Sequence, residues 1–324
     1  MRSFWENLSR PFFCLAPLAD VTDAAFRRII AKYGKPDVMW TEFVSVDGLC
    51  SAGRQTLLRD FVYTESERPI VAQIFGSKPD NFYKAARLIK KLRFDGIDIN
   101  MGCPDRSVEK QGGGAAMIKS PELAQEVICA TQEGGGGLPV SVKTRVGFNK
   151  VELETWIPKL LETKLAAITI HARTRKEMSK VPARWGYIKE AVELAKALQQ
   201  SRGQGSGTLI IGNGDVKDLA DAKIKADETG ADGIMLGRAI FGNPFLFRNK
   251  NAPTIEEKLK VMVEHTKLFH ELLGDIKSFA VMKKHYKAYV NGFDGAKELR
   301  VKLMKTETPD DVEAIAQDFL RTRT

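Results

Sequence analysis

The sequence predicts an α/β protein, a (β/α)₈ TIM barrel followed by a small C-terminal helical domain. Eight short apolar runs, typical of strands buried on both faces, alternate with segments of helical periodicity. The eight units take up about 240 residues, close to the roughly 250 residues of such a barrel. An open, doubly wound parallel sheet is the alternative, but it typically has fewer strands. We expect the barrel domain to span residues 1–248 and the helical domain residues 249–324.

Each expected strand is a short apolar run that ends at polar residues or at a turn signal. The strands are expected at residues 12–18, 38–44, 70–75, 97–100, 140–144, 167–171, 208–212 and 233–236. Helices are expected between them at 24–33, 79–92, 120–133, 152–163, 188–199 and 217–229. Asp23 and Pro79 are start signals for the first two of these helices. The segment 45–68 is a longer polar excursion with room for a short helix.

Four more helical patterns follow the barrel, at residues 255–273, 279–289, 296–304 and 310–320. The stretch from Lys277 to Lys305 contains eight basic residues and two acidic ones. Such clustering predicts a basic face that contacts a polyanion, with Lys283, Lys284 and Lys287 among its members. A solvated lysine-rich face without a partner is the alternative interpretation.

Composition and charge exclude several classes of protein. The chain has a net charge of +9 and four widely spaced cysteines with no CxxC pair. This pattern indicates reduced thiols and no structural metal, and the charge suggests an anionic partner. The polar residues 1–10 lack a signal sequence, and no run of 18 apolar residues is present. We therefore expect a cytoplasmic protein without a membrane segment.

Polar side chains stand at the carboxyl end of nearly every predicted barrel strand. In a barrel these ends form the active site, so the residues there are expected to surround one ligand. The residues are Pro17 and Leu18 after the first strand; Gln73 in the third; Asn100 and Cys103 at the fourth; Lys143 and Arg145 at the fifth; His171, Arg173 and Arg175 at the sixth; Asn213, Gly214 and Asp215 after the seventh; and Gly237 and Arg238 after the eighth.

Three of these positions predict a particular chemistry. Gly214 and Gly237 leave backbone N–H groups accessible near helix starts, where barrels bind phosphate, and Arg238 supplies a cation. Lys143 at a strand end would stabilise negative charge that develops on an electron-rich ring such as a reduced flavin. A plain glycine turn and a solvated lysine are the alternatives. Cys103 lies on a tight turn between Gly102 and Pro104, where it is either a reactive group or an inert packing residue.

Seven motifs together resemble the tRNA-dihydrouridine synthases, over about residues 12 to 305. The motifs begin at Ala16 (APLADVTD), Gln73 (QIFG), Asn100 (NMGCP), Val142 (VKTR), His171 (HARTR), Asn213 (NGDV) and Gly237 (GR). The resemblance implies an FMN-bound TIM barrel and a small helical domain. It also implies an enzyme that reduces the C5–C6 double bond of selected tRNA uridines with NADPH.

The resemblance also implies roles for individual residues. Cys103 would be the catalytic acid that protonates C5 after reduced FMN has given a hydride to C6. Apart from the resemblance, the strand-end positions of Asn100 and Arg145 predict contacts with the uracil edge, and Arg173 and Arg175 are also expected to contact the substrate. The clustering of charge predicts that Lys283, Lys284 and Lys287 contact the tRNA phosphates. The FMN-binding residues would be Pro17, Leu18, Ala19, Gln73, Lys143, His171, Asn213, Asp215, Gly237 and Arg238, together with Gly214 of the predicted phosphate site.

Two departures from the family pattern stand out. Leu18 replaces a methionine, which is a nearly isosteric change. After Arg175 the chain has Glu177, Ser179 and Val181 where the family commonly has glutamine, tyrosine and glycine. This second departure leaves open which uridine is modified.

Two alternative functions are compatible with the sequence. A dihydroorotate dehydrogenase-like enzyme would also be an FMN barrel acting on a pyrimidine, but it gives no reason for the basic helical segment. An RNA-binding protein that has lost catalysis would not need Cys103 and Lys143. We expect a monomer with tRNA as its partner, FMN as cofactor, NADPH as electron donor and no metal.

Overall fold

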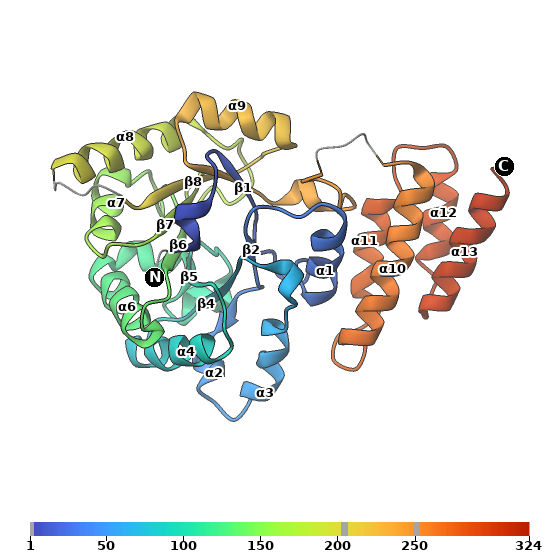
Figure 1. Cartoon of the computed structure of the whole chain (residues 1–324), viewed down its shortest axis with the longest axis horizontal. Coiled ribbons are helices and arrows are strands. Elements are labelled where there is room, and N and C mark those ends of the chain that lie inside the picture. The colour runs from blue at the N-terminus through green and yellow to red at the C-terminus, as the bar shows by residue number, and fades with distance from the viewer. Residues whose placement is uncertain (1–2, 202–206, 249–252, 324) are drawn as a thin grey trace. The chain divides into compact units, whose positions relative to one another are not determined.

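The computed structural model describes residues 3–201, 207–248 and 253–323 (Figure 1). The chain forms two compact units. The first comprises Met1–Leu18, Asp37–Val62 and Arg68–Gly237, and the second Ala19–Pro36, Tyr63–Glu67 and Arg238–Thr324. The division into a catalytic domain up to residue 248 and a tRNA-binding domain after it stays a prediction.

The first unit is the predicted barrel of parallel strands. Its sheet has the order β1-β9-β8-β7-β6-β5-β4-β2, with β3 also paired to β4. The seam between β1 and β2 is bridged because the Leu15 N–H donates to the Val38 carbonyl (3.2 Å) and the Asp37 N–H to the Phe13 carbonyl (2.9 Å). The strands are β1 (Phe12–Leu15), β2 (Met39–Trp40), β3 (Val44–Ser45), β4 (Ile70–Phe75), β5 (Gly96–Met101), β6 (Val140–Arg145), β7 (Ala167–His171), β8 (Leu209–Asn213) and β9 (Gly233–Leu236).

The second predicted strand is divided into two short pieces. The prediction of one strand over 38–44 missed this interruption, which lies at Thr41. The Thr41 N–H still donates to the Val71 carbonyl (3.0 Å), but the next contact with β4 uses the side chain, since the Gln73 N–H donates to the Thr41 hydroxyl (3.1 Å). A side-chain acceptor in place of a carbonyl ends the regular ladder between β2 and β3.

Helices cover the outside of the barrel, as Figure 1 shows for α4, α6, α7, α8 and α9. α4 and α6 pack so closely that a Cβ at Gly134 would lie 2.3 Å from the Tyr83 carbonyl oxygen. Glycine is therefore required at this position. The excursion 45–68 carries α2 (Val46–Leu49) and α3 (Arg54–Leu57) and two single turns. The remaining helices are α4 (Pro79–Lys91), α5 (Arg106–Lys110), α6 (Pro121–Gly135), α7 (Leu153–Leu161), α8 (Gly186–Ser201) and α9 (Leu219–Thr229).

The amino end of the barrel is filled by aromatic side chains. Trp5 is buried and packs against Phe12 and Trp40, with ring centroids 5.7 and 6.1 Å apart. The same cluster includes residues at the beginnings of β7 and β8, Ala167 and Leu209. Apolar side chains therefore fill the interior of the barrel at this end.

The second unit is helical. α1 (Ala24–Tyr33) packs in it with α10 (Ile255–Leu273), and a buried ion pair between Arg27 and Glu67 (2.8 Å) ties α1 to the turn at residues 65–67. α11 (Val281–Tyr289), α12 (Ala296–Leu303) and α13 (Pro309–Arg321) follow, so all four helices predicted after the barrel are confirmed. In the part of the chain that the structure describes, no helix is long and apolar enough to cross a membrane.

Candidate active site

The strand register brings most of the predicted site residues to one end of the barrel. Asn100 on β5 pairs with Lys143 on β6. Two residues further along β6, Arg145 is aligned with His171 on β7, which is aligned with Asn213 on β8. The carboxyl ends of neighbouring strands therefore present an amide, an ammonium group, a guanidinium group and an imidazole side by side.

Cys103 is held on a turn that Asn100 organises. The Asn100 Oδ1 atom accepts the N–H groups of Gly102 (3.1 Å) and Cys103 (2.9 Å) directly after β5. The Cys103 carbonyl accepts the Ala115 N–H (3.0 Å). Gly114 lies against this turn at φ 59°, and a Cβ there would come within 2.7 Å of the Cys103 carbonyl oxygen. These contacts from both sides fix the backbone that carries the thiol.

The environment of Cys103 keeps its thiol protonated. The residue is half-buried, and burial raises the pKa of the Cys103 thiol. A hydrogen bond from the Asp105 backbone lowers this pKa, and the Asp105 carboxylate raises it. The cationic side chains of Arg145 and Lys143 also lower it, but the effect of burial is larger than any of these. The thiol is therefore protonated at neutral pH and is not a thiolate.

A buried carboxylate lies beneath the Cys103 turn. Asp98 accepts hydrogen bonds from Gln73 Nε2 (2.7 Å) and from the Ser141 hydroxyl (2.5 Å). Gln73 in turn accepts from Asn100 Nδ2 (3.0 Å). Burial raises the pKa of Asp98 to about 6, although its two hydrogen-bond donors act in the opposite direction.

Lys143 is anchored by an amide, and no described carboxylate lies within hydrogen-bond distance of its ammonium group. Its Nζ donates to Asn213 Oδ1 (3.2 Å), and Asn213 Nδ2 donates to the Met235 carbonyl (2.8 Å). Burial, together with the nearby Arg145 charge, lowers the pKa of Lys143 to about 8. The ammonium group therefore stands in a poorly solvated position, where it gains from any anionic ligand.

His171, Arg173 and Asp215 form a second polar cluster at the ends of β7 and β8. Arg173 is buried and bonds His171 Nε2 (3.1 Å), the Val181 carbonyl (2.6 Å) and the Asp215 carboxylate. A guanidinium group only donates, so His171 Nε2 accepts and Nδ1 carries the proton. Gly214 adopts φ 126°, which favours glycine, and positions the turn that carries Asp215.

Arginines connect the segment after β5 with the segment after β7. Arg145 is buried and donates to the carbonyls of Gly102 (2.7 Å), Thr174 (3.2 Å) and Met178 (3.2 Å). Burial lowers the pKa of Arg145 to about 10. Arg175 makes a two-pronged ion pair with Glu109 of α5. The Cys103 turn is thus attached to the segment that follows β7.

Glu177, one of the departures from the family pattern, has a structural role in that segment. Its carboxylate accepts the Thr174 N–H (2.8 Å) and a hydrogen bond from Arg184 Nη2 (2.5 Å). Burial by itself would raise the pKa of Glu177, but these hydrogen bonds together outweigh it and lower the pKa. Ser179 is exposed, and the Val181 carbonyl serves Arg173.

Some predicted residues are not part of these networks. Pro17 is buried and Leu18 half-buried after β1. Gly237 follows β9, and a Cβ there would lie 3.6 Å from the Ala16 side chain and 4.0 Å from that of Leu18. Ala19 and Arg238 belong to the second unit, as do the lysines of α11. Lys283 and Lys284 are half-buried there, and Lys287 is exposed. The assigned roles of all these residues stay predictions.

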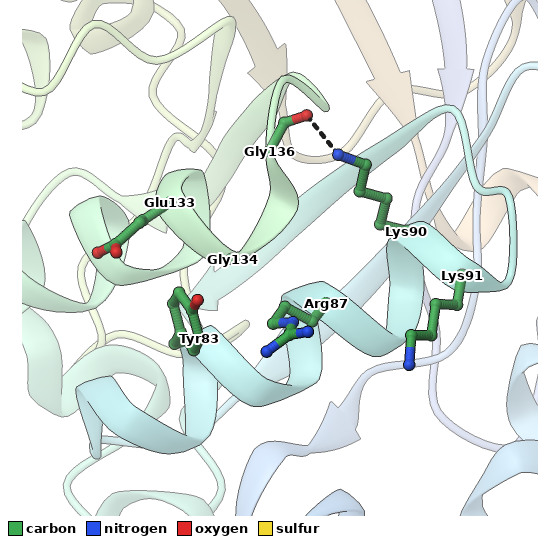
Figure 2. A pocket seen from close by; sticks show the side chains of 7 residues that line it. All are labelled: Tyr83, Arg87, Lys90, Lys91, Glu133, Gly134 and Gly136. Atoms are coloured by element: carbon green, nitrogen blue, oxygen red, sulfur yellow. Dashed lines mark hydrogen bonds between the residues drawn. The ribbon is translucent and has the colours of Figure 1, made fainter.

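A pocket of about 310 Å³ lies elsewhere on the barrel (Figure 2). It is lined by Arg87, Lys90 and Lys91 of α4 and by the end of α6, and Lys90 Nζ donates to the Gly136 carbonyl (2.7 Å). α4 and α6 both end just before the amino ends of strands, so this pocket is on the face opposite the Cys103 turn. Its cations complement the carbonyls of two helix carboxyl ends, which is a structural role.

Sequence reasoning missed Asp98, Ser141 and Glu109. The sequence did contain a signal for Asp98, because a carboxylate inside an apolar strand must find buried partners. It contained no signal for Glu109, since the partner Arg175 is 66 residues away. Among the described residues, no group of three or more histidine, cysteine, aspartate or glutamate side chains is arranged to hold a metal ion.

Comparisons with known proteins agree on one family. The sequence model of the dihydrouridine synthase family matches residues 14–324. A probable tRNA-dihydrouridine synthase of Staphylococcus aureus (strain MRSA252) is 40% identical over 322 residues, which cover 98% of this chain and 95% of that protein. Probable tRNA-dihydrouridine synthase 2 of Bacillus subtilis (strain 168) is 41% identical over 323 residues, covering 98% and 97%.

Solved structures share the fold at low sequence identity. Morphinone reductase superposes with a TM-score of 0.53 at 14% identity, over 78% of this chain and 91% of that chain. Histamine dehydrogenase from Rhizobium sp. 4-9 gives a TM-score of 0.53 at 13% identity, over 79% of this chain and 48% of that chain. The predicted barrel fold is therefore confirmed.

Proposed function

The chain belongs to the dihydrouridine synthase family, and we propose that it reduces the C5–C6 double bond of specific uridines in tRNA, with FMN as cofactor and NADPH as electron donor. The observation that carries this proposal is the half-buried Cys103 thiol, fixed by Asn100 at the carboxyl end of β5 with a raised pKa. A protonated thiol close to an ammonium group and several amides suits the reduction of a pyrimidine ring.

The residues at the barrel mouth fit an FMN group. Lys143 has an amide oxygen as its hydrogen-bond acceptor and a lowered pKa, so an anionic ring edge would stabilise its charge. Backbone N–H groups of the Gly214 turn and of Gly237 would donate hydrogen bonds to the phosphate, and Arg238 would supply a cation. Gln73, His171, Asn213 and Asp215 would hold the rest of the group, with Pro17, Leu18 and Ala19 packing beside it.

In the proposed reaction, Cys103 supplies the proton. When bound, FMN would supply hydride chemistry at C6 of the uracil, with NADPH as the electron source. Cys103 then donates its proton to C5, where negative charge has developed. Asn100 and Arg145 have more N–H donors than their hydrogen bonds to the described residues use, and the others would serve the uracil edge. Arg173 and Arg175, which follow β7, would also contact the substrate.

The proposed substrate requires contacts beyond the barrel mouth. The basic face that includes Lys283, Lys284 and Lys287 would bind tRNA phosphates. The target uridine must leave its stack to enter the mouth, which costs a few kcal/mol unless it is already unpaired. We place the enzyme in the cytoplasm as a monomer.

One experiment tests the proposal directly. The protein is expressed in a strain that lacks dihydrouridine synthases, and dihydrouridine positions in its tRNA are mapped against the empty vector. The purified protein should be yellow, should be bleached by NADPH, and should reduce uridine in unmodified tRNA but not free orotate. A colourless protein, turnover of orotate, or tRNA without dihydrouridine would contradict the proposal.

A further inference from the structure

Five buried or half-buried groups form one continuous hydrogen-bonded chain below the site. At one end the Asp98 carboxylate accepts from Ser141 (2.5 Å) and from Gln73 Nε2 (2.7 Å). In the middle Gln73 Oε1 accepts from Asn100 Nδ2 (3.0 Å). At the other end Asn100 Oδ1 accepts the Cys103 N–H (2.9 Å) and that of its neighbour Gly102.

The direction of this chain is imposed from both ends. A carboxylate only accepts and a backbone N–H only donates, whichever way the two amides between them are turned. Two amides can satisfy both ends only when each donates toward Asp98 and accepts from the side of Cys103. The side chain of Asp98 is fully buried, as is that of Gln73, and Asn100 is 7% exposed, so a reversed amide would bring like groups together away from bulk solvent.

We propose that Asp98 is a positioning residue for Cys103: it fixes the orientation of Gln73 and Asn100 and thereby holds the turn that carries the thiol. The position of the thiol is important only if Cys103 is the proton donor, so this inference rests on the proposed function. Asp98 itself does not touch the substrate. It acts through two amides that the sequence analysis assigned to other roles, Gln73 to the cofactor and Asn100 to the substrate.

Reversing the chain tests the proposal. In N100D the new carboxylate can accept the turn N–H groups but cannot donate to Gln73, so one junction must pair two acceptors. In the double variant D98N/N100D, the new amide at position 98 donates to Gln73. The Gln73 amide then turns over and donates to the new carboxylate at position 100, so every junction is satisfied again. In D98N alone, the oxygen of the new amide can still accept from Gln73, and its NH₂ group can donate to the Ser141 hydroxyl, which then acts as the acceptor.

The readout is amide hydrogen exchange in the holoenzyme, measured on peptides that contain Gly102 and Cys103. N100D should exchange about fivefold or more faster at these two amides, the scale of one lost hydrogen bond. D98N/N100D and D98N should stay within about twofold of the wild type, and peptides of α13 should not change. Comparing N100D with D98N/N100D is a matched test, because both variants carry the carboxylate at position 100.

Two outcomes would overturn the proposal: unchanged exchange in N100D, or a double variant that exchanges as fast as N100D. If N100D does not fold, the pair Q73E and D98N/Q73E provides the same test, since the new carboxylate at position 73 faces a carboxylate in the first and an amide donor in the second. Dihydrouridine formation is measured separately. Its absence in the wild type refutes the proposed function, while the exchange pattern still decides the role of Asp98.

Discussion

At the scale of single residues, burial moves the pKa values of two groups in the candidate site in opposite directions. Burial keeps Cys103 protonated, whereas burial of Lys143 lowers the pKa of its ammonium group to about 8. A carboxylate in the place of Cys103 would be ionised at neutral pH unless its own pKa were strongly raised. A thiol, whose usual pKa already lies above neutral pH, is protonated there with or without this shift.

Replacing Cys103 should affect proton donation only. In C103A we expect oxidation of NADPH by the bound cofactor to continue nearly unchanged, while dihydrouridine formation falls about 10²-fold or more, the usual effect of losing a positioned acid. The two rates are measured by stopped-flow absorbance and by mass spectrometry of digested tRNA. C129A, which removes an exposed cysteine, is the control.

The pH profile provides a second readout for the same residue. Since a raised pKa keeps the thiol protonated to higher pH, product formation should decline only in the alkaline range, as the thiol ionises. Full activity in C103A, or a profile that C103A does not alter, would show that Cys103 is a packing residue.

At the scale of elements, the segments after β5 and β7 are held to one another by arginines. Glu109 of α5 and Arg175 form a two-pronged pair, and the side chains are only 14% and 24% exposed. Such geometry is stronger than that of ordinary surface pairs. The pair limits the motion of the segment that begins at Cys103.

Removing one charge from this pair should loosen the Cys103 segment. We expect E109Q to lose about 1–2 kcal/mol of stability, because a partly buried guanidinium group keeps only part of its hydrogen bonding. Exchange of peptides spanning α5 should rise, and the KM for tRNA should rise with it. E122Q is the control, since Glu122 meets Lys159 at 3.9 Å in an exposed pair and should have no measurable effect.

An equal loss of stability in E109Q and E122Q would contradict this account. So would an E109Q variant whose α5 peptides exchange at the wild-type rate.

Much at this scale could be predicted from the sequence, because it depends on local patterns. The barrel strands and the helices α10 to α13 follow from short apolar runs and from helical periodicity. The break at Thr41 could not, because it depends on a hydrogen bond from Gln73, 32 residues away. The site shows the same limit: strand ends locate Cys103 and Lys143, but the partner Asp98 is identified only by its contacts.

The helices of the second unit contain two buried histidines. His265 of α10 and His285 of α11 have ring centroids 4.7 Å apart, and three of their four ring nitrogens lack a hydrogen-bond partner among the described residues. Burial lowers the pKa of His265 well below its usual range and that of His285 to about 3. Their neighbours are Phe26, Phe241 and the Tyr289 hydroxyl, none of which can stabilise an imidazolium charge as a carboxylate would.

This pair should make the protein sensitive to mild acid. Below about pH 6.5 the unfolded histidines bind protons that the folded ones cannot, so stability falls as pH falls, by about 1.4 kcal/mol per pH unit for each histidine. H285F should remove one such contribution in denaturant unfolding between about pH 7 and pH 5. H270F, at an exposed position of α10, is the control. An identical pH dependence in H285F and the wild type would refute the explanation.

At the scale of the whole molecule, charge is distributed unevenly among the helices of the second unit. α11 carries Lys283, Lys284 and Lys287 and no acidic residue, whereas α13 carries four acidic residues, Asp310, Asp311, Glu313 and Asp318. Residues 283 and 287, and residues 284 and 287, share a helix face by their spacing. The net charge of +9 therefore includes a concentrated basic face on α11.

Removing that face should weaken tRNA binding through electrostatics alone. The triple variant K283A/K284A/K287A should raise the Kd for tRNA and flatten its salt dependence, since each lost phosphate contact lowers the log–log slope by about 0.7 to 0.9. Cofactor content and NADPH oxidation without tRNA should not change.

K189A/K196A/K223A removes the same charge from exposed positions on α8 and α9 and should leave the slope nearly intact. If both triple variants flatten the slope equally, net charge and not the α11 face attracts tRNA, and an unaltered slope in the α11 variant would mean that tRNA binds elsewhere.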